Sequence, residues 1–99
     1  MKVRRTELFD KWLRKLKDKQ AKVLITSRLQ RLAFGHLGDS KPVGNGVHEL
    51  RIHVGPGYRL YYTRHGDEWI LLLMGGNKGS QARDIKRAKQ MVKDYDNQG

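Results

Sequence analysis

The stretch that decides the fold runs from Val47 to Arg64 and reads VHELRIHVGPGYRLYYTR. Apolar and polar residues alternate over Val47–Val54 and again over Tyr58–Arg64, with Gly55-Pro56-Gly57 between them, which is the pattern of two strands joined by a turn. A largely apolar run follows over Glu68–Met74, as expected for a strand that is covered on both faces. Because the connections are short, these three strands are predicted to form an antiparallel meander.

The N-terminal half is predicted to be helical. After a short first strand over Val3–Glu7, apolar residues recur at helical spacing over 8–16 and again over 21–33, with the polar break Lys17-Asp18-Lys19 between them. So short a join predicts an antiparallel helical hairpin. Gly35 is a natural end for the second helix, and residues 35–46 are expected to form a loop.

The C-terminal part predicts a flexible Gly75–Gly79 loop and then a last helix, capped by Ser80 with Asp84 in its first turn. Its inner stripe is expected to hold Ile85, Ala88, Val92 and Tyr95. The predicted fold is therefore α+β, in the order β-α-α-β-β-β-α, with the hairpin packed on one face of a small curved sheet and a C-terminal helix completing it. The partner of the first strand stays open. Ninety-nine residues fit a single domain over 1–99.

Composition narrows the class of protein. The chain has no cysteine, which excludes disulfides and thiolate chemistry. The N-terminus is charged and lacks the apolar segment of a secretory signal, and the longest apolar run is too short to cross a membrane. We therefore expect a cytoplasmic protein with no membrane partner.

Charge is the strongest compositional feature. Lys and Arg total 21 against 10 acidic residues, which gives a net charge of +11. So large a charge on a small body favours a polyanionic partner, such as RNA or the ribosome, through phosphate contacts and counterion release. An acidic protein partner is the alternative, and a basic surface that only solubilises the chain is the plainest interpretation.

The candidate site follows from the alternation of the strands. If the helical hairpin covers the apolar face, Arg51, His53, Arg59 and Tyr61 share the opposite face, and Lys78 follows the third strand. Neighbouring strands place such side chains about 5 Å apart, which suits a phosphodiester because arginine offers phosphate a fixed fork of donors. The alternative is that these arginines only solvate an outer face. Tyr58 and Tyr62 share a face with Leu60 and are expected in the core.

Other chemistries lack support. No His or Cys pair has metal-ligand spacing, so no metal site is expected. Gly75-Gly76-Asn77-Lys78-Gly79 lacks the spacing of a nucleotide-triphosphate loop. Asp39 and Glu49 are isolated in the sequence and do not form a predicted carboxylate pair. No cofactor is expected.

Four segments together resemble the RelE/ParE superfamily of type II toxins, and within it the HigB-like addiction module killer branch. They are Gly44–Ile52, Gly55–Tyr62, Leu72–Lys78, and Gln81–Ile85 with Ala88. The resemblance covers nearly the whole chain in the right order. It implies a toxin neutralised by a small cognate antitoxin, often a helix-turn-helix protein, and a member that enters the ribosomal A site and cleaves mRNA.

The resemblance also assigns roles to residues. It places the basic site at Arg51, Arg59 and Lys78, while the C-terminal tyrosine of the RelE toxins is replaced here by Arg83 and Asp84. The implied mechanism is metal-free attack of the RNA 2′-hydroxyl on its neighbouring phosphate. Arg51 and Arg59 then stabilise the developing negative charge. They are not assigned as bases, because the pKa of arginine is so high that its side chain stays protonated. Lys78 serves as acid or second clamp, and His53 as base because its ordinary pKa is near 7.

Further contacts to RNA are expected from Tyr61, Asn77, Arg83 and Lys41. Three alternatives stay open at this point: a ParE-type poison of DNA gyrase, a non-catalytic module that binds RNA or the ribosome, and a folded toxin that has lost activity.

Overall fold

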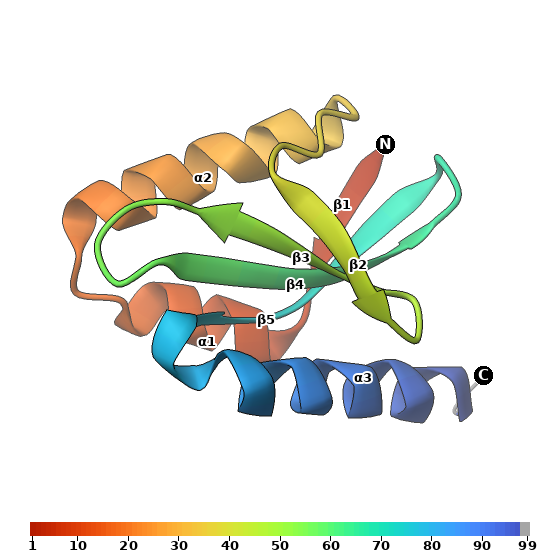
Figure 1. Ribbon diagram of the computed structural model, residues 1–99. Coiled ribbons are helices and arrows are strands. Elements are labelled where there is room, and N and C mark those ends of the chain that lie inside the picture. The colour runs from red at the N-terminus through yellow and green to blue at the C-terminus, as the bar shows by residue number, and fades with distance from the viewer. Residues whose placement is uncertain (98–99) are drawn as a thin grey trace.

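Residues 1–97 are described by a computed structural model, in which a five-stranded mixed sheet carries helices on both faces (Figure 1). The elements in chain order are β1 (Lys2–Arg5), α1 (Glu7–Lys15), α2 (Lys19–Ala33), β2 (Ser40–Gly44), β3 (Val47–Ile52), β4 (Tyr58–His65), β5 (Trp69–Asn77), the 3-10 turn η1 (Lys78–Ser80) and α3 (Gln81–Asn97). The predicted α+β class is confirmed.

The sheet order is β1-β5-β4-β3-β2. The predicted meander of β3, β4 and β5 is confirmed as two antiparallel pairings. The open question of the first strand is answered by β1, which pairs with β5 in parallel, from Lys2 opposite Trp69 to Arg5 opposite Leu72. As a result β5 lies inside the sheet, in agreement with its apolar sequence.

One strand was missing from the prediction. Residues 40–44, expected in a loop, form the edge strand β2 and pair antiparallel with β3. The turn between them is Asn45-Gly46, and both residues have positive φ, at 56° and 77°, as a two-residue hairpin requires. Pro42 and Gly44 made the segment resemble a loop, but an edge strand tolerates both.

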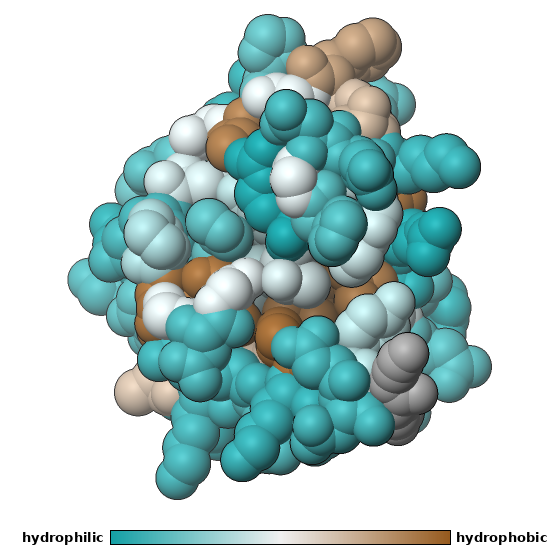
Figure 2. Space-filling view, turned by 90° about the vertical axis from the view of Figure 1, so that its right-hand side faces the viewer, coloured by the Kyte–Doolittle hydropathy of each residue, from teal (hydrophilic) through white to brown (hydrophobic). Residues whose placement is uncertain are grey.

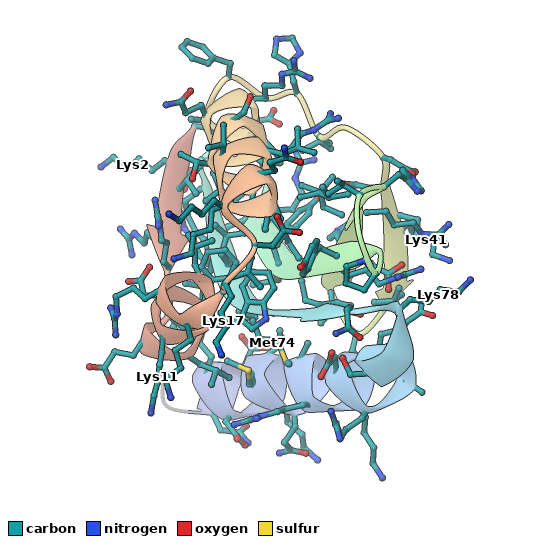
Figure 3. All side chains as sticks on the ribbon, turned by 90° about the vertical axis from the view of Figure 1, so that its left-hand side faces the viewer. Lys2, Lys11, Lys17, Lys41, Met74 and Lys78 are labelled. Carbon is teal, nitrogen blue, oxygen red and sulfur yellow. The ribbon has the colours of Figure 1, made fainter. Side chains whose placement is uncertain are left out.

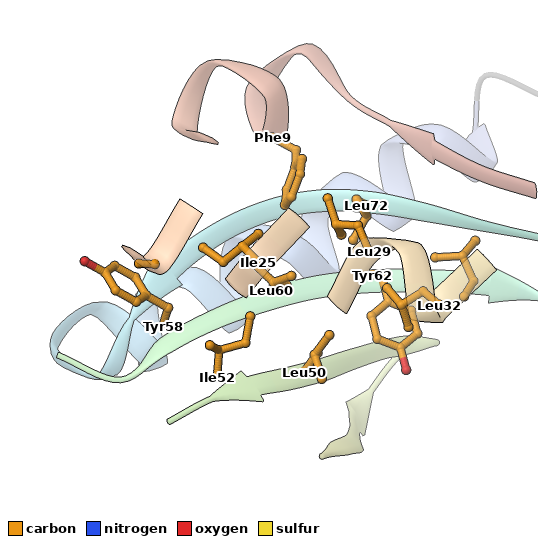
Figure 4. Packing of buried hydrophobic residues seen from close by; sticks show 12 residues of the cluster. Phe9, Ile25, Leu29, Leu32, Leu50, Ile52, Tyr58, Leu60, Tyr62 and Leu72 are labelled. Atoms are coloured by element: carbon orange, nitrogen blue, oxygen red, sulfur yellow. The ribbon is translucent and has the colours of Figure 1, made fainter. Parts of the chain in front are cut away.

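A first core fills the space between the sheet and the helical hairpin. Phe9 of α1, Ile25 of α2, and Leu60 and Leu72 of the sheet are fully buried and turn toward one another (Figure 4). Tyr58 and Tyr62 belong to this core, as predicted. The hairpin itself is confirmed, with Thr6 and Asp18 capping the two helices and Gly35 following the end of α2 at a φ of 84°.

A second core lies on the other face of the sheet, under α3. Val47, Tyr61, Leu73 and Met74 are buried there against Ala88. The face on which the polar candidates were placed is thus not open along its length, because α3 packs against it. The predicted inner stripe of α3 is correct through Val92 but fails at Tyr95, which is 49% exposed.

The junction before α3 also differs from the prediction. Gly75, Gly76 and Asn77 are the end of β5 and not a flexible loop. Asn77 caps η1, because its side chain accepts from the backbone of Gly79, and Ser80 Oγ accepts in return from Asn77 N. Ser80 directly precedes α3, and its hydroxyl donates to Asp84 in the first turn of that helix. Within residues 1–97, no helix has the length and apolar character needed to cross a membrane.

Candidate active site

A single buried carboxylate organises the polar end of the sheet. Glu49 of β3 has no exposed surface, and it accepts hydrogen bonds from Arg51 Nε at 3.2 Å, Tyr61 Oη at 3.2 Å and Gln81 Nε2 at 3.0 Å. Arg59 Nε lies 3.6 Å from Glu49 Oε2, which adds an ion pair. Two strands, β3 and β4, and the helix α3 thus converge on one charge, in accordance with the rule that buried charges are paired.

The two arginines are direct neighbours. Arg51 and Arg59 face each other across β3 and β4, and Arg59 is in turn opposite Gly76 of β5. Arg59 Nη1 donates to the carbonyl of Gly57 at 3.0 Å, and the residue is 9% exposed, whereas the Arg51 side chain is 31% exposed. The predicted juxtaposition of Arg51 and Arg59 is confirmed. Both guanidiniums are held in place, and neither one swings freely in solvent.

The protonation states follow from this arrangement. Burial alone would raise the pKa of Glu49, but hydrogen bonds from its neighbours and the charge of Arg59 hold that pKa below its usual value. Burial and the charge of Glu49 raise the pKa of Tyr61. At neutral pH the cluster therefore combines one carboxylate, two guanidiniums and a protonated phenol, with a net charge of +1.

Lysines extend this positive surface. Lys78 is exposed at the start of η1, and its Cβ is 3.6 Å from the position that a Cβ on Gly57 would take, close to Arg59 Nη1. Lys41 of β2 is exposed opposite Glu49. Lys41 and Lys78 extend from the same side of the molecule (Figure 3). The site thus consists of Arg51 and Arg59, with two exposed lysines near them.

His53 lies just beyond β3 and pairs with Asp39, with 2.6 Å between Nε2 and Oδ2. The hydrogen bond to His53 holds the pKa of Asp39 below its usual value, and the charges of Arg51 and Lys41 act in the same direction. Both side chains are more than half exposed. The imidazole therefore has an orienting carboxylate and lies at the edge of the arginine cluster.

The other residues that were predicted to contact RNA lie in different environments. The expectation that Tyr61 lies on an open face was wrong: it is fully buried and donates to Glu49, so its ring is not accessible to a base. The side-chain oxygen of Asn77 is used in its capping interaction. Arg83 is exposed on the first turn of α3, two positions after Gln81. Their contacts to RNA remain predictions, as do those of Lys41.

Sequence reasoning missed Glu49 and Gln81. Glu49 appeared isolated because two of its partners are distant in the sequence. Tyr61 comes from β4, and Gln81 comes from α3, 32 positions away. One signal was available: a carboxylate sits within an otherwise basic strand pair, directly opposite Tyr61 in the register. In the part of the chain that the structure describes, no three His, Asp or Glu side chains are grouped to hold a metal ion.

The opposite end of the molecule carries an apolar groove. There Leu71, Leu73 and Val92 line a groove of about 330 Å³ beside the exposed Tyr95. Figure 2, which looks at this end, shows apolar surface within a ring of polar side chains. The two ends of the α3 face thus differ, one being basic and the other apolar.

Residues 11–93 match the family described as Phage derived protein Gp49-like. The chain belongs to this Gp49-like family. The family is associated with toxin-antitoxin systems, so an antitoxin is its expected kind of partner. The chain is also 44% identical to an uncharacterized protein of Haemophilus influenzae over 94 residues, which is 95% of each chain.

Proposed function

We propose that this Gp49-like protein is the toxin of a type II toxin-antitoxin system, of the HigB-like RelE branch, and that it cleaves mRNA on the ribosome. The observation that carries the proposal is the Arg51–Arg59 pair, fixed by the buried Glu49 at the end of the sheet that α3 leaves uncovered. Family membership and the net charge of +11 support a toxin with a polyanionic target.

The chemistry needs positive charge held ready for the transition state. When the 2′-hydroxyl attacks the adjacent phosphate, charge develops on the phosphoryl oxygens, and fixed donors stabilise it without reorganising. Glu49 supplies that fixity, because it offsets the repulsion between two adjacent guanidiniums while leaving a net positive site. Arginine is suited to this role and not to proton transfer.

We assign proton transfer to the residues beside the arginine cluster. Imidazole is the side chain used most often for general acid–base catalysis, and Asp39 orients the ring of His53, so His53 is the base that we assign. Lys78 stands on the other side of the arginines and is assigned as acid or second phosphate clamp. The ribosome would hold the messenger in the reactive geometry, which accounts for much of the rate in such reactions.

The proposed partner is a cognate antitoxin, a small helix-turn-helix protein with an acidic segment that covers the basic site. Complementary charge would steer this segment to Lys41, Lys78 and the arginines. Inhibition then follows from occlusion of the site.

The test is a cleavage assay in a reconstituted bacterial translation system, with messenger 5′ ends mapped by primer extension. We expect wild type to make discrete cuts that require ribosomes. Arg59→Ala should lower cleavage by about a hundredfold or more, the scale of losing one transition-state donor, and His53→Ala should slow it. Arg31→Ala, at the exposed end of α2, is the matched control and should cut as wild type does.

Intact messenger in the presence of wild type would contradict the proposal. If translation still stopped, a steric block of the ribosome would be the better account. If translation continued and DNA double-strand breaks appeared in cells, the chain would be a gyrase poison.

A further inference from the structure

A groove of about 370 Å³ lies beside the arginine site, between α1 and α3. Trp12 of α1 forms one wall, and Arg83, Asp84 and Arg87 of α3 form the other. The floor is the backbone of Gly75 and Gly76 near Met74, which lies between the two helices in Figure 3. The groove therefore combines an aromatic ring, two guanidiniums and a carboxylate.

The edge of β5 is open at this point. β1 pairs with β5 only as far as Leu72, and the side chain of Thr6 then donates to the carbonyl of Leu73. Beyond that residue, β5 faces α1 instead of another strand. The space that side chains on Gly75 and Gly76 would take is filled by the ring of Trp12 and by the carboxylate of Asp84, so a ligand in the groove meets these two side chains.

Asp84 is the buried polar group of this groove. It is 6% exposed, and its Oδ2 accepts from Ser80 Oγ. Within residues 1–97, Oδ2 is the oxygen that accepts from the protein, and Oδ1 is not among the fully enclosed side-chain atoms that lack a partner. Asp84 lines the groove, and a carboxylate oxygen there can accept a hydrogen bond from a ligand that carries an N–H donor.

We propose that this groove binds one unpaired nucleobase that carries an exocyclic amino group, that is, adenine, cytosine or guanine in preference to uracil. The inference rests on the proposed function, since the base would belong to the nucleotide next to the scissile phosphate. Asp84 accepts from the amino group, Trp12 forms the apolar wall beside the ring, and Arg83 and Arg87 attract the flanking phosphates. Uracil is disfavoured because its two carbonyl oxygens flank its single N–H and repel the carboxylate.

Position and size favour a base over a peptide. Arg59 is paired with Gly76 in the register, and neighbouring strands are about 4.8 Å apart, so the groove is one strand away from the proposed phosphate site. Base-reading pockets in general combine an apolar or aromatic wall with hydrogen bonds to the edge of the base. The groove has both, and its volume suits a single ring system and not a helix.

The test is a titration of the ¹⁵N-labelled full chain with AMP, CMP, GMP and UMP, followed by two-dimensional NMR. The chain has two tryptophans, Trp12 in the groove and Trp69 at the far end beside His65. We expect the Trp12 indole and the Gly75 and Gly76 amides to shift saturably while Trp69 stays in place. UMP should bind at least about fivefold more weakly than the other three.

Asp84→Asn is the decisive variant. An asparagine amide can donate as well as accept, so it can pair with uracil, and the preference against UMP should disappear while Trp69 and the rest of the spectrum report a retained fold. Arg87→Ala, on the rim of the groove, should weaken all four nucleotides alike. Equal binding of the four nucleotides to wild type, or no shift with any of them, would overturn the proposal. Shifts only on adding a glutamate-rich peptide would assign the groove to an acidic protein partner instead.

The cleavage assay separates this inference from the proposed function. If wild type cuts messenger but binds no mononucleotide in the groove, the nuclease stands and the subsite is overturned. If the groove discriminates between nucleotides but the messenger stays intact, the subsite stands and the nuclease is overturned. If both hold, the bases found next to the cuts should be depleted in uracil with wild type and not with Asp84→Asn.

Discussion

The carboxylate of Glu49 receives three hydrogen bonds and an ion pair while having no contact with solvent. Removing one partner of a buried charge pair costs more than the pair contributes, because the other charge is left desolvated. Glu49→Gln preserves the shape but leaves Arg51 and Arg59 without their counter-charge. We expect it to lower the free energy of unfolding by about 2–4 kcal/mol, measured by urea denaturation.

Glu68→Gln is the control at this scale. The Glu68 side chain is 75% exposed and, within residues 1–97, pairs only with His65, so its loss should change stability by no more than about 0.5 kcal/mol. Equal stabilities for the two variants would show that Glu49 does not hold the arginines.

At the scale of elements, the end of β5 is shaped by what lies over its glycines. A Cβ on Gly76 would be 1.9 Å from Asp84 Oδ2, and one on Gly75 would be 2.4 Å from the ring of Trp12. Gly76→Ala should therefore displace α3 from the sheet and cost about 1–3 kcal/mol of stability, read from thermal or urea unfolding. Asp84→Ala in the same chain should recover part of the loss. Additive effects of the two changes would contradict the contact.

The same elements show how far sequence reasoning reaches. β3, β4 and the helical hairpin were predicted to within a few residues, because alternation, helical spacing and turn residues agree there. The Gly75-Gly76 pair was mistaken for a loop. Glycine is needed at these positions because Trp12 and Asp84, which are distant in sequence, pack directly over them. The closeness of Arg51 and Arg59 follows from local pairing and was predictable. The burial of Arg59 beside Glu49 depends on tertiary contacts that no local pattern contains.

For the whole molecule, lowering the pH should reduce the free energy of unfolding in two steps. Burial and the charge of Arg64 lower the pKa of His48, which stacks on Tyr62. The unfolded chain therefore binds that proton more readily than the folded one, so stability falls as pH drops below about 6.5. Glu49 has a lowered pKa as well, so the stability that it contributes is lost only further down, as pH falls through its folded value below 4.5.

The expected curve of unfolding free energy against pH is thus flat near pH 7.5, declines through a first step below about pH 6.5 and declines again below about pH 4.5. The growing net positive charge, already +11 at pH 7, adds self-repulsion in the same direction. His48→Phe retains an aromatic ring beside Tyr62 and removes the titrating group, so it should abolish the first step and leave the second. Urea unfolding of both proteins from about pH 3 to pH 8 covers both steps and measures this. A first step of unchanged size in His48→Phe would mean that another group gives the chain its sensitivity to mild acid.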